Sequence, residues 1–221
     1  LDPYARALDG KPVLGPELYA HAVDEDLSPA CVPFIPSELD SAGNVALGVV
    51  TGEQFPIVPG PKVPEGRTVV YETHVKGFTH DMPDVPPELR GTYAGMAHPA
   101  AIEHLLSLGV TAVELLPIHA AFSEAFLLKR GRTNYWGYST LSYFAPEPSY
   151  ATAASQAAGP QAVLDELRGM ISLLHKAGLE VIMDVVYNHT CESGVDGPSL
   201  SLRGLGNLEY YLHSPHRPAQ Y

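Results

Sequence analysis

Three short segments of the chain are almost continuously apolar or β-branched. Residues 68–75 are rich in β-branched and aromatic side chains, and residues 110–117 and 180–186 are dominated by aliphatic ones. Runs of this kind are typical of strands in a sheet, and the second and third are typical of strands buried on both faces. We therefore expect three strands.

Two other segments repeat apolar residues every three or four positions, as an amphipathic helix does. The first begins at Pro99, which suits the first turn of a helix, and ends at Gly109. The second has its apolar stripe over residues 163–174 and a glycine stop at Gly178. These two segments are expected to be helices.

The resulting order is strand, helix, strand, long connection, helix, strand. Alternation with short helix-to-strand turns predicts an α/β fold with parallel strands and right-handed crossovers. A doubly wound sheet and an eight-stranded barrel would both begin in this way. The connection over residues 118–159 is too long for a purely structural link, and it follows the carboxyl end of a strand, where both folds place their ligand sites.

The first 66 residues have a different composition, rich in Pro, Gly and acidic side chains with only short apolar runs. This suits the tail of a small β domain followed by a linker, and Pro56, Pro59, Pro61 and Pro64 predict a stiff, extended connector. We place a domain boundary after residue 66, with residues 67–221 forming the start of the α/β domain.

Charge and cysteine content narrow the classes of partner. The formal net charge is −12, and nucleic acids and anionic membranes both need basic patches, so neither is an expected partner. No apolar run is long enough to span a membrane. Cys31 and Cys191 lie far apart without metal-ligand spacing, so we expect no disulfide framework and a reducing cytoplasm.

The first candidate site is an aromatic cluster in the long connection, at residues 134–138, which includes Trp136 and Tyr138. Sugar rings have apolar faces and polar rims, so aromatic rings flanked by hydrogen-bonding groups suit a saccharide site. The alternative is that these rings pack the connection onto the sheet.

The second candidate site ends the third predicted strand, where Asp184, Asn188 and His189 leave a buried apolar run. A charge there is costly unless it is paired or used, although capping of local backbone groups is an equally open reading. A metal cluster with His74, His80 or His119 can be imagined, but the spacings fit no tight zinc pattern. The sequence also lacks a Gly-x-Ser-x-Gly elbow and a glycine-rich phosphate loop.

The stretch 184–189, Asp-Val-Val-Tyr-Asn-His, resembles the first signature region of the α-amylase superfamily of glycoside hydrolases. The opening residues 2–6 resemble the boundary between the N-terminal β-sandwich and the barrel of its isoamylase and glycogen debranching branch. Further segments match that branch in the same order, so that the resemblance covers essentially the whole chain: 70–79, 91–93, 112–117, 134–138, 173–178, 196–198 and 201–204.

The resemblance implies a β-sandwich domain, a (β/α)₈ TIM barrel and a C-terminal β domain. Residues 1–66 would hold the tail of the sandwich and the linker, and residues 67–221 about three βα units of the barrel. The implied activity is hydrolysis of α-1,6 branch linkages in glycogen or limit dextrins by a retaining mechanism. In this branch the nucleophile and the acid/base follow the fourth and fifth strands, so these 221 residues are expected to lack both and to be inactive alone.

The resemblance also assigns roles to individual residues. Tyr138 matches the tyrosine that stacks on the sugar at the cleavage point, His189 matches the histidine that binds its primary hydroxyl, and Asp184 supports the site. Trp136 is counted with them as substrate-binding. Asn188 matches a position that binds calcium in many amylases, and debranching relatives often lack that ion. Calcium at Asn188 is therefore not counted as an expected metal, and no cofactor is expected.

Two other functions are compatible with this resemblance. One is a branching or trehalose-releasing enzyme of the same superfamily, which the debranching-like stretch 196–204 disfavours. The other is a non-catalytic glucan-binding protein that kept the barrel and lost its carboxylates. In each case the expected partner is a branched α-glucan.

Overall fold

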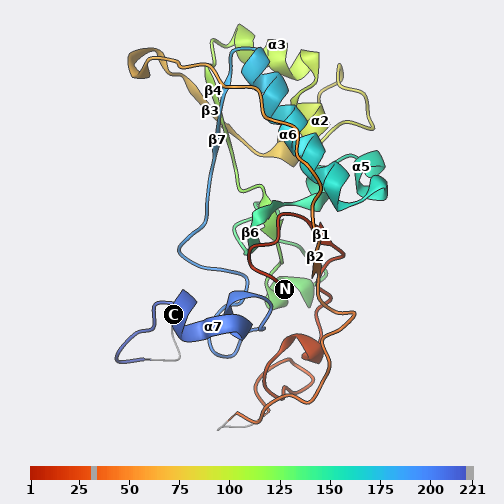
Figure 1. Cartoon of the computed structure of the whole chain (residues 1–221), viewed down its shortest axis with the longest axis vertical. Helices are drawn as coiled ribbons and strands as arrows, with labels where there is room; N and C mark the ends of the chain where they lie inside the picture. The colour runs from red at the N-terminus through yellow and green to blue at the C-terminus, as the bar shows by residue number, and fades with distance from the viewer. Residues whose placement is uncertain (31–33, 218–221) are drawn as a thin grey trace.

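A computed structural model describes residues 1–30 and 34–217 of the chain, so Cys31 lies outside the described residues. The fold is mixed α/β and elongated, with a parallel sheet at one end and a second, irregular layer at the other (Figure 1). The described elements are β1 (Leu8–Asp9), η1 (Pro16–Leu18), β2 (Leu47–Gly48), η2 (Glu65–Arg67), β3 (Val70–Thr73), α1 (Val75–Phe78), α2 (Tyr93–Met96), α3 (Pro99–Ser107), β4 (Ala112–Leu115), β5 (His119–Ala121), α4 (Ala125–Leu128), β6 (Thr140–Pro146), η3 (Pro148–Tyr150), α5 (Ala153–Ala158), α6 (Pro160–Lys176), β7 (Glu180–Met183) and α7 (Leu202–Tyr210).

The three expected strands are present and parallel, in the order β3-β4-β7. Each is four residues long and therefore shorter than its apolar run. The register places Glu72 beside Glu114 and Glu114 beside Ile182, so these side chains form one row on the same face of the sheet. This face is the more open one, with Glu72 and Ile182 exposed.

Helices α2, α3 and α6 cover the opposite face of the sheet (Figure 1). Both expected helices are confirmed, and α3 and α6 each begin at a proline. Proline has no backbone N–H, but an N–H in the first turn of a helix has no partner within the helix, so no hydrogen bond is lost. Their buried residues pack with those of β4 into one apolar core that includes Leu105, Val113, Met170 and Leu174.

The long connection is more ordered than the sequence predicts. Residues 118–159 contain the antiparallel pair β5 and β6, the short helices α4 and α5, and η3. The sequence does not predict β6, because the strand contains polar residues and Pro146 and has no long apolar run. Its first three residues are nevertheless buried. The pairing of β5 and β6 is irregular, with shifts of register on both sides of Ala120.

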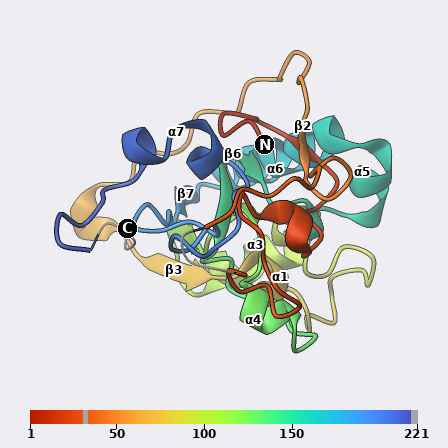
Figure 2. The ribbon, with the colours of Figure 1, turned by 90° about the horizontal axis from the view of Figure 1, so that it is seen from below.

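Residues 1–66 contain the antiparallel pair β1 and β2, each of two residues, the 3-10 helix η1, the start of η2 and otherwise irregular chain. Their apolar side chains form a second core with residues of β6 and of the segment after β7. The N-terminal end of the ribbon lies close to β6 in both views (Figure 1, Figure 2). The backbone nitrogen of Leu1 donates to the carbonyl oxygen of Leu200 at 2.8 Å, and the amide of Ser199 donates to Leu18 O at 2.8 Å. The domain boundary after residue 66 stays a prediction.

The proline-rich connector runs extended along helix α6 (Figure 1). Hydrogen bonds attach it to the helix at several heights. The amide of Gly52 donates to Gln161 Oε1 at 2.9 Å, the amide of Val58 to Ser172 Oγ at 3.2 Å, and Arg168 Nη2 to Phe55 O at 2.7 Å. The connector is therefore held to the α/β part along its length. Within the described ranges, no helix is long and apolar enough to cross a membrane.

Candidate functional site

Tyr138 and Asp184 are brought together at the carboxyl-terminal edge of the parallel sheet. Asp184 directly follows β7, where its amide donates to Leu115 O of β4 at 3.0 Å. Tyr138 lies just before β6 in the long connection, and its phenol donates to Asp184 Oδ2 at 2.5 Å. Both candidate segments therefore meet in one place.

His189 contacts the same tyrosine through the main chain. Its Nε2 lies 2.7 Å from the carbonyl oxygen of Tyr138, which can only accept, so the ring carries its proton on Nε2. The hydroxyl of Tyr143 donates to the carbonyl of His189 at 3.2 Å. The imidazole is exposed and its Nδ1 faces away from this hydrogen bond, so Nδ1 is the ring atom that can accept from a ligand hydroxyl.

The environment of Tyr138 keeps its phenol protonated. The hydrogen bond to Asp184 raises the pKa of Tyr138 to about 12, with smaller contributions from burial and from the charges of Asp184, Glu72 and Glu114. The two glutamates belong to the open row on the sheet face. The phenol is thus a fixed hydrogen-bond donor to Asp184, and its ring is left to meet a ligand.

Trp136 and Tyr138 line a shallow hollow of about 510 Å³ with Leu127 of α4. The Trp136 ring is 64% exposed and meets Tyr138 edge to face, with ring centroids 6.3 Å apart. Gly137 between them has a φ of +81°, and a Cβ there would lie 2.9 Å from Pro117 O. Glycine is required at this position for the two rings to lie on the same hollow.

Tyr135, the third ring of the cluster, also lines this hollow and differs from the other two rings by a structural contact. It stacks on His74 with centroids 4.4 Å apart. His74 Nδ1 accepts from the amides of Lys76 and Gly77 at 3.0 and 3.2 Å, and its Nε2 donates to Tyr135 O at 2.8 Å. Burial lowers the pKa of His74, with the charge of Lys76 adding to the effect and the hydrogen bond to Tyr135 opposing it. His74 is therefore neutral, and its contacts attach the end of β3 to the long connection.

A metal centre finds no support in the side chains. Among the residues that the structure describes, no group of three His, Cys, Asp or Glu could hold a metal ion. Asn188 is exposed beside His189 and has no cluster of carboxylates around it.

Glu192 is the functional-site neighbour whose role the sequence did not reveal. Its carboxylate is 1% exposed and accepts from the amides of Leu200, Ser201 and Arg203 at 2.6, 2.7 and 3.0 Å, and from Tyr211 Oη at 2.6 Å. Three of these donors precede or begin α7, so Glu192 caps that helix from a distance in sequence. The sequence around Glu192 has no periodic pattern that would predict a buried carboxylate at this position.

Relatives of this chain include the "Glycogen operon protein GlgX homolog" of Mycobacterium tuberculosis (strain H37Rv). The two are 44% identical over an alignment of 221 residues that covers 98% of this chain and 29% of that protein. The "Glycogen debranching enzyme" of Yersinia pseudotuberculosis serotype IB is 44% identical over 217 residues, 97% of the chain and 30% of that enzyme. The chain is homologous to bacterial glycogen debranching enzymes. It spans less than a third of the length of these relatives.

The solved structures point the same way. Pullulanase from Paenibacillus barengoltzii, in complex with maltohexaose and α-cyclodextrin, has a TM-score of 0.57 and 29% identity over 72% of this chain and 25% of that one. No protein-family model matches the chain. The resemblance inferred from the short sequence segments is therefore confirmed by homology over 97–98% of this chain, whereas the individual site residues remain predictions.

Proposed function

We propose that the protein carrying this chain hydrolyses α-1,6 branch linkages in glycogen or limit dextrins. The observation that carries the proposal is the double attachment of Tyr138, whose phenol donates to Asp184 and whose carbonyl accepts from His189. Three residues with assigned sugar-contacting or supporting roles thus form one unit at the edge of the sheet where α/β folds bind ligands. The similarity to glycogen debranching enzymes names the substrate class.

In this proposal Tyr138 is the platform for the sugar at the cleavage point. A phenol ring whose hydroxyl is already bound to Asp184 has little rotational freedom, so it offers an apolar face in a fixed position. Trp136, exposed on the same hollow, provides a second ring for a neighbouring sugar. The pullulanase that the chain resembles was solved with maltohexaose, which supports an α-glucan as the ligand.

His189 binds a sugar hydroxyl through Nδ1, because Nε2 already donates a hydrogen bond to Tyr138 O. Asp184 has one oxygen committed to the phenol, and we assign it a supporting role rather than nucleophilic attack. A retaining mechanism needs a nucleophile and an acid/base that flank the bond, and we place both outside these 221 residues.

We also propose for this protein the barrel and sandwich architecture that the resemblance implies. Residues 67–221 would form the first βα units of a (β/α)₈ barrel, with β3, β4 and β7 as its first three strands. The open row of Glu72, Glu114 and Ile182 would then face the barrel interior. Residues 1–66 would be the end of a β-sandwich domain and its linker, and the protein would act in the cytoplasm on branched α-glucan.

The test is incubation of the protein with a branched limit dextrin and, separately, with linear amylose. We expect new reducing ends and linear malto-oligosaccharides from the dextrin and none from amylose. Release of products from amylose would assign α-1,4 hydrolysis instead. Absence of any products, with binding of the dextrin retained, would favour the non-catalytic glucan-binding alternative.

A further inference from the structure

Glu192 closes a ring of hydrogen bonds with Thr190 and Tyr211, directly after the proposed sugar-binding residue His189. The phenol of Tyr211 donates to Glu192 Oε2 at 2.6 Å. Because the phenol has a single proton and uses it in this bond, Thr190 is the donor in the 2.6 Å contact between its Oγ1 and Tyr211 Oη. The backbone amide of Glu192 in turn donates to Thr190 Oγ1 at 3.2 Å. The ring therefore begins and ends on Glu192.

The carboxylate of Glu192 also joins the two ends of the segment that contains α7. Its oxygens accept from three backbone amides at or just before the start of the helix, and from Tyr211, which directly follows the helix. The helix is interrupted at Gly206, whose backbone angles are not helical. A regular helix therefore does not connect the two ends, and Glu192 provides a direct link between them.

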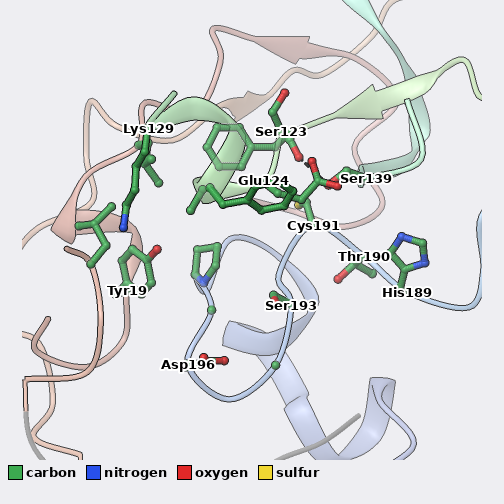
Figure 3. A pocket seen from close by; sticks show the side chains of 18 of the residues that line it. Tyr19, Ser123, Glu124, Lys129, Ser139, His189, Thr190, Cys191, Ser193 and Asp196 are labelled. Carbon is green, nitrogen blue, oxygen red and sulfur yellow. Dashed lines mark hydrogen bonds between the residues drawn. The ribbon is translucent and has the colours of Figure 1, made fainter. Parts of the chain in front are cut away.

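Thr190 places this ring beside His189. Figure 3 shows the two side chains next to each other among those that line a cavity of about 570 Å³, which Tyr211 also lines. The other contacts of this stretch are made with strand β6: the hydroxyl of Tyr143 donates to His189 O at 3.2 Å, and the amide after Thr190 donates to Thr140 O at 3.0 Å. The main chain at His189 is thus held by β6 and by the ring.

Burial favours a closed ring. Glu192 is 1% exposed, and Thr190 and Tyr211 are half-buried. Burial, followed by the hydrogen bond to Glu192, raises the pKa of Tyr211, so the phenol keeps the proton that the ring requires. Loss of one hydroxyl would leave a neighbouring polar group without its partner, so the three residues are expected to act as a unit.

We infer that Glu192 is a positioning residue for His189 and acts through Thr190 and Tyr211. The ring fixes the main chain at Thr190, and with it the direction in which the imidazole of His189 presents Nδ1 to a sugar hydroxyl. The inference rests on the proposed function, from which it takes the role of His189. A misplacement of about 1 Å can cost about 100-fold in rate, so a loosened ring reduces activity although every residue that contacts the sugar is present.

The test is a double-mutant cycle of Tyr211→Phe and His189→Ala in the full-length protein, measured as kcat/KM on a branched limit dextrin. Tyr211→Phe removes one hydroxyl of the ring and should lower kcat/KM about 3- to 10-fold, mostly through kcat. In the His189→Ala background the same substitution should change kcat/KM by less than about 2-fold, because no imidazole is left to position. Thr190→Val should behave like Tyr211→Phe, and Thr190→Ser, which keeps the hydroxyl, should stay near the wild type.

Tyr210→Phe is the matched control. Tyr210 is 41% exposed, and its hydroxyl lies 3.0 Å from that of Tyr4, so this variant loses a tyrosine hydroxyl outside the ring and should keep a kcat/KM near that of the wild type. An equal loss in Tyr210→Phe and Tyr211→Phe overturns the inference. Equal losses from Tyr211→Phe with and without His189 also overturn it, because they indicate a general structural effect, and so does unchanged activity in both Tyr211→Phe and Thr190→Val.

A wild type that releases no products from the dextrin refutes the proposed function separately. The same cycle, measured as the Kd for maltohexaose, then decides the inference. Binding that weakens in Tyr211→Phe, without further weakening when Tyr211→Phe is added to His189→Ala, supports the positioning role. Additive weakening, unchanged binding in Tyr211→Phe or no binding by the wild type rejects it.

Discussion

The phenol oxygen of Tyr138 lies 2.5 Å from Oδ2 of Asp184, although 46 residues separate the two in the chain. The contact joins the end of β7 to the long connection after β4, so the position of the Tyr138 ring depends on both. A hydrogen bond to a carboxylate is charge-assisted and stronger than one between neutral groups. Its properties can be measured in several ways.

The first prediction concerns the ionisation of Tyr138. Because the hydrogen bond to Asp184 raises the pKa of Tyr138 to about 12, its phenol should ionise later than an ordinary tyrosine. The folded pKa lies above the usual value of about 10, so this group stabilises the fold below about pH 10 and the stabilisation is lost as the pH rises toward 12. In Asp184→Asn, ultraviolet titration should place the Tyr138 transition closer to 10, with Tyr138→Phe identifying the signal. An unchanged transition in Asp184→Asn would contradict the assignment.

The second prediction concerns catalysis by the protein that carries this chain. Contacts with the distorted, charge-developing sugar should count more in the transition state than in the ground state. Tyr138→Ala and His189→Ala should each lower kcat/KM on a branched limit dextrin by about 10- to 1000-fold, largely through kcat. The melting temperature should change little in His189→Ala, because that side chain is exposed and lies outside the apolar cores, and it should fall in Tyr138→Ala, because that variant also loses the hydrogen bond to Asp184. Near-normal kcat in both variants would remove the assigned roles.

The third prediction separates Tyr135 from Tyr138. Tyr135 stacks on His74, and the loss of this aromatic contact should cost about 0.5–1.5 kcal/mol of unfolding free energy in Tyr135→Ala. The value of kcat should stay near that of the wild type. Denaturant unfolding together with kinetics measures both quantities, and the outcome would be contradicted by a large drop in kcat with unchanged stability.

The fourth prediction concerns acid stability. Burial lowers the pKa of His74, and also that of His21 and His119, so all three are held neutral in the folded chain. Their stabilisation is fully present above the ordinary pKa of about 6.5 and is lost as the pH falls through the lower folded values. The melting temperature should therefore decrease below about pH 6.5. The decrease should be shallower in His74→Gln and unchanged in His80→Gln, whose imidazole is exposed.

The fifth prediction concerns Glu192. In Glu192→Gln an amide NH₂ replaces an oxygen that accepts from buried donors, so at least one N–H or O–H loses its partner. The expected cost is about 1–3 kcal/mol of unfolding free energy. Glu209→Gln, on the exposed surface of α7, is the control and should change stability by less than about 0.5 kcal/mol. Equal effects in the two variants would mean that the carboxylate contacts are not the cause.

The regular elements of the α/β part could be predicted because each has one dominant period. The stripe over residues 163–174 lies inside α6, and the run over residues 110–117 contains β4. The predicted strands are longer than the observed ones, because the runs of apolar residues extend beyond the residues that pair in the sheet. The pair β5 and β6 escaped prediction since its register is irregular and no simple alternation marks β5.

The residues of the candidate site were identifiable, but their contacts were not. Asp184 and His189 stand out as polar residues at the end of an apolar run, and Tyr138 as part of an aromatic cluster. The bond from His189 to Tyr138 uses a backbone carbonyl, which every residue has and which no pattern can single out. The sequence likewise does not distinguish Tyr135 from Tyr138, because the difference depends on His74, 61 residues away from Tyr135.

The contact between Leu1 and Leu200 has a consequence for folding during synthesis. Residues 1–30 are translated well before Leu141, Cys191 and Leu200, yet their apolar side chains complete their core only with these later residues. At about 5–20 residues per second, the segment waits roughly 10–40 s for these partners. During that interval Leu18 and Tyr19, fully or nearly fully buried in the finished fold, are exposed to solvent and to other nascent chains. Residues 191–200 thus determine when Leu18 and Tyr19 become protected, and chaperone binding to residues 1–30 should end only when the segment after β7 has been translated.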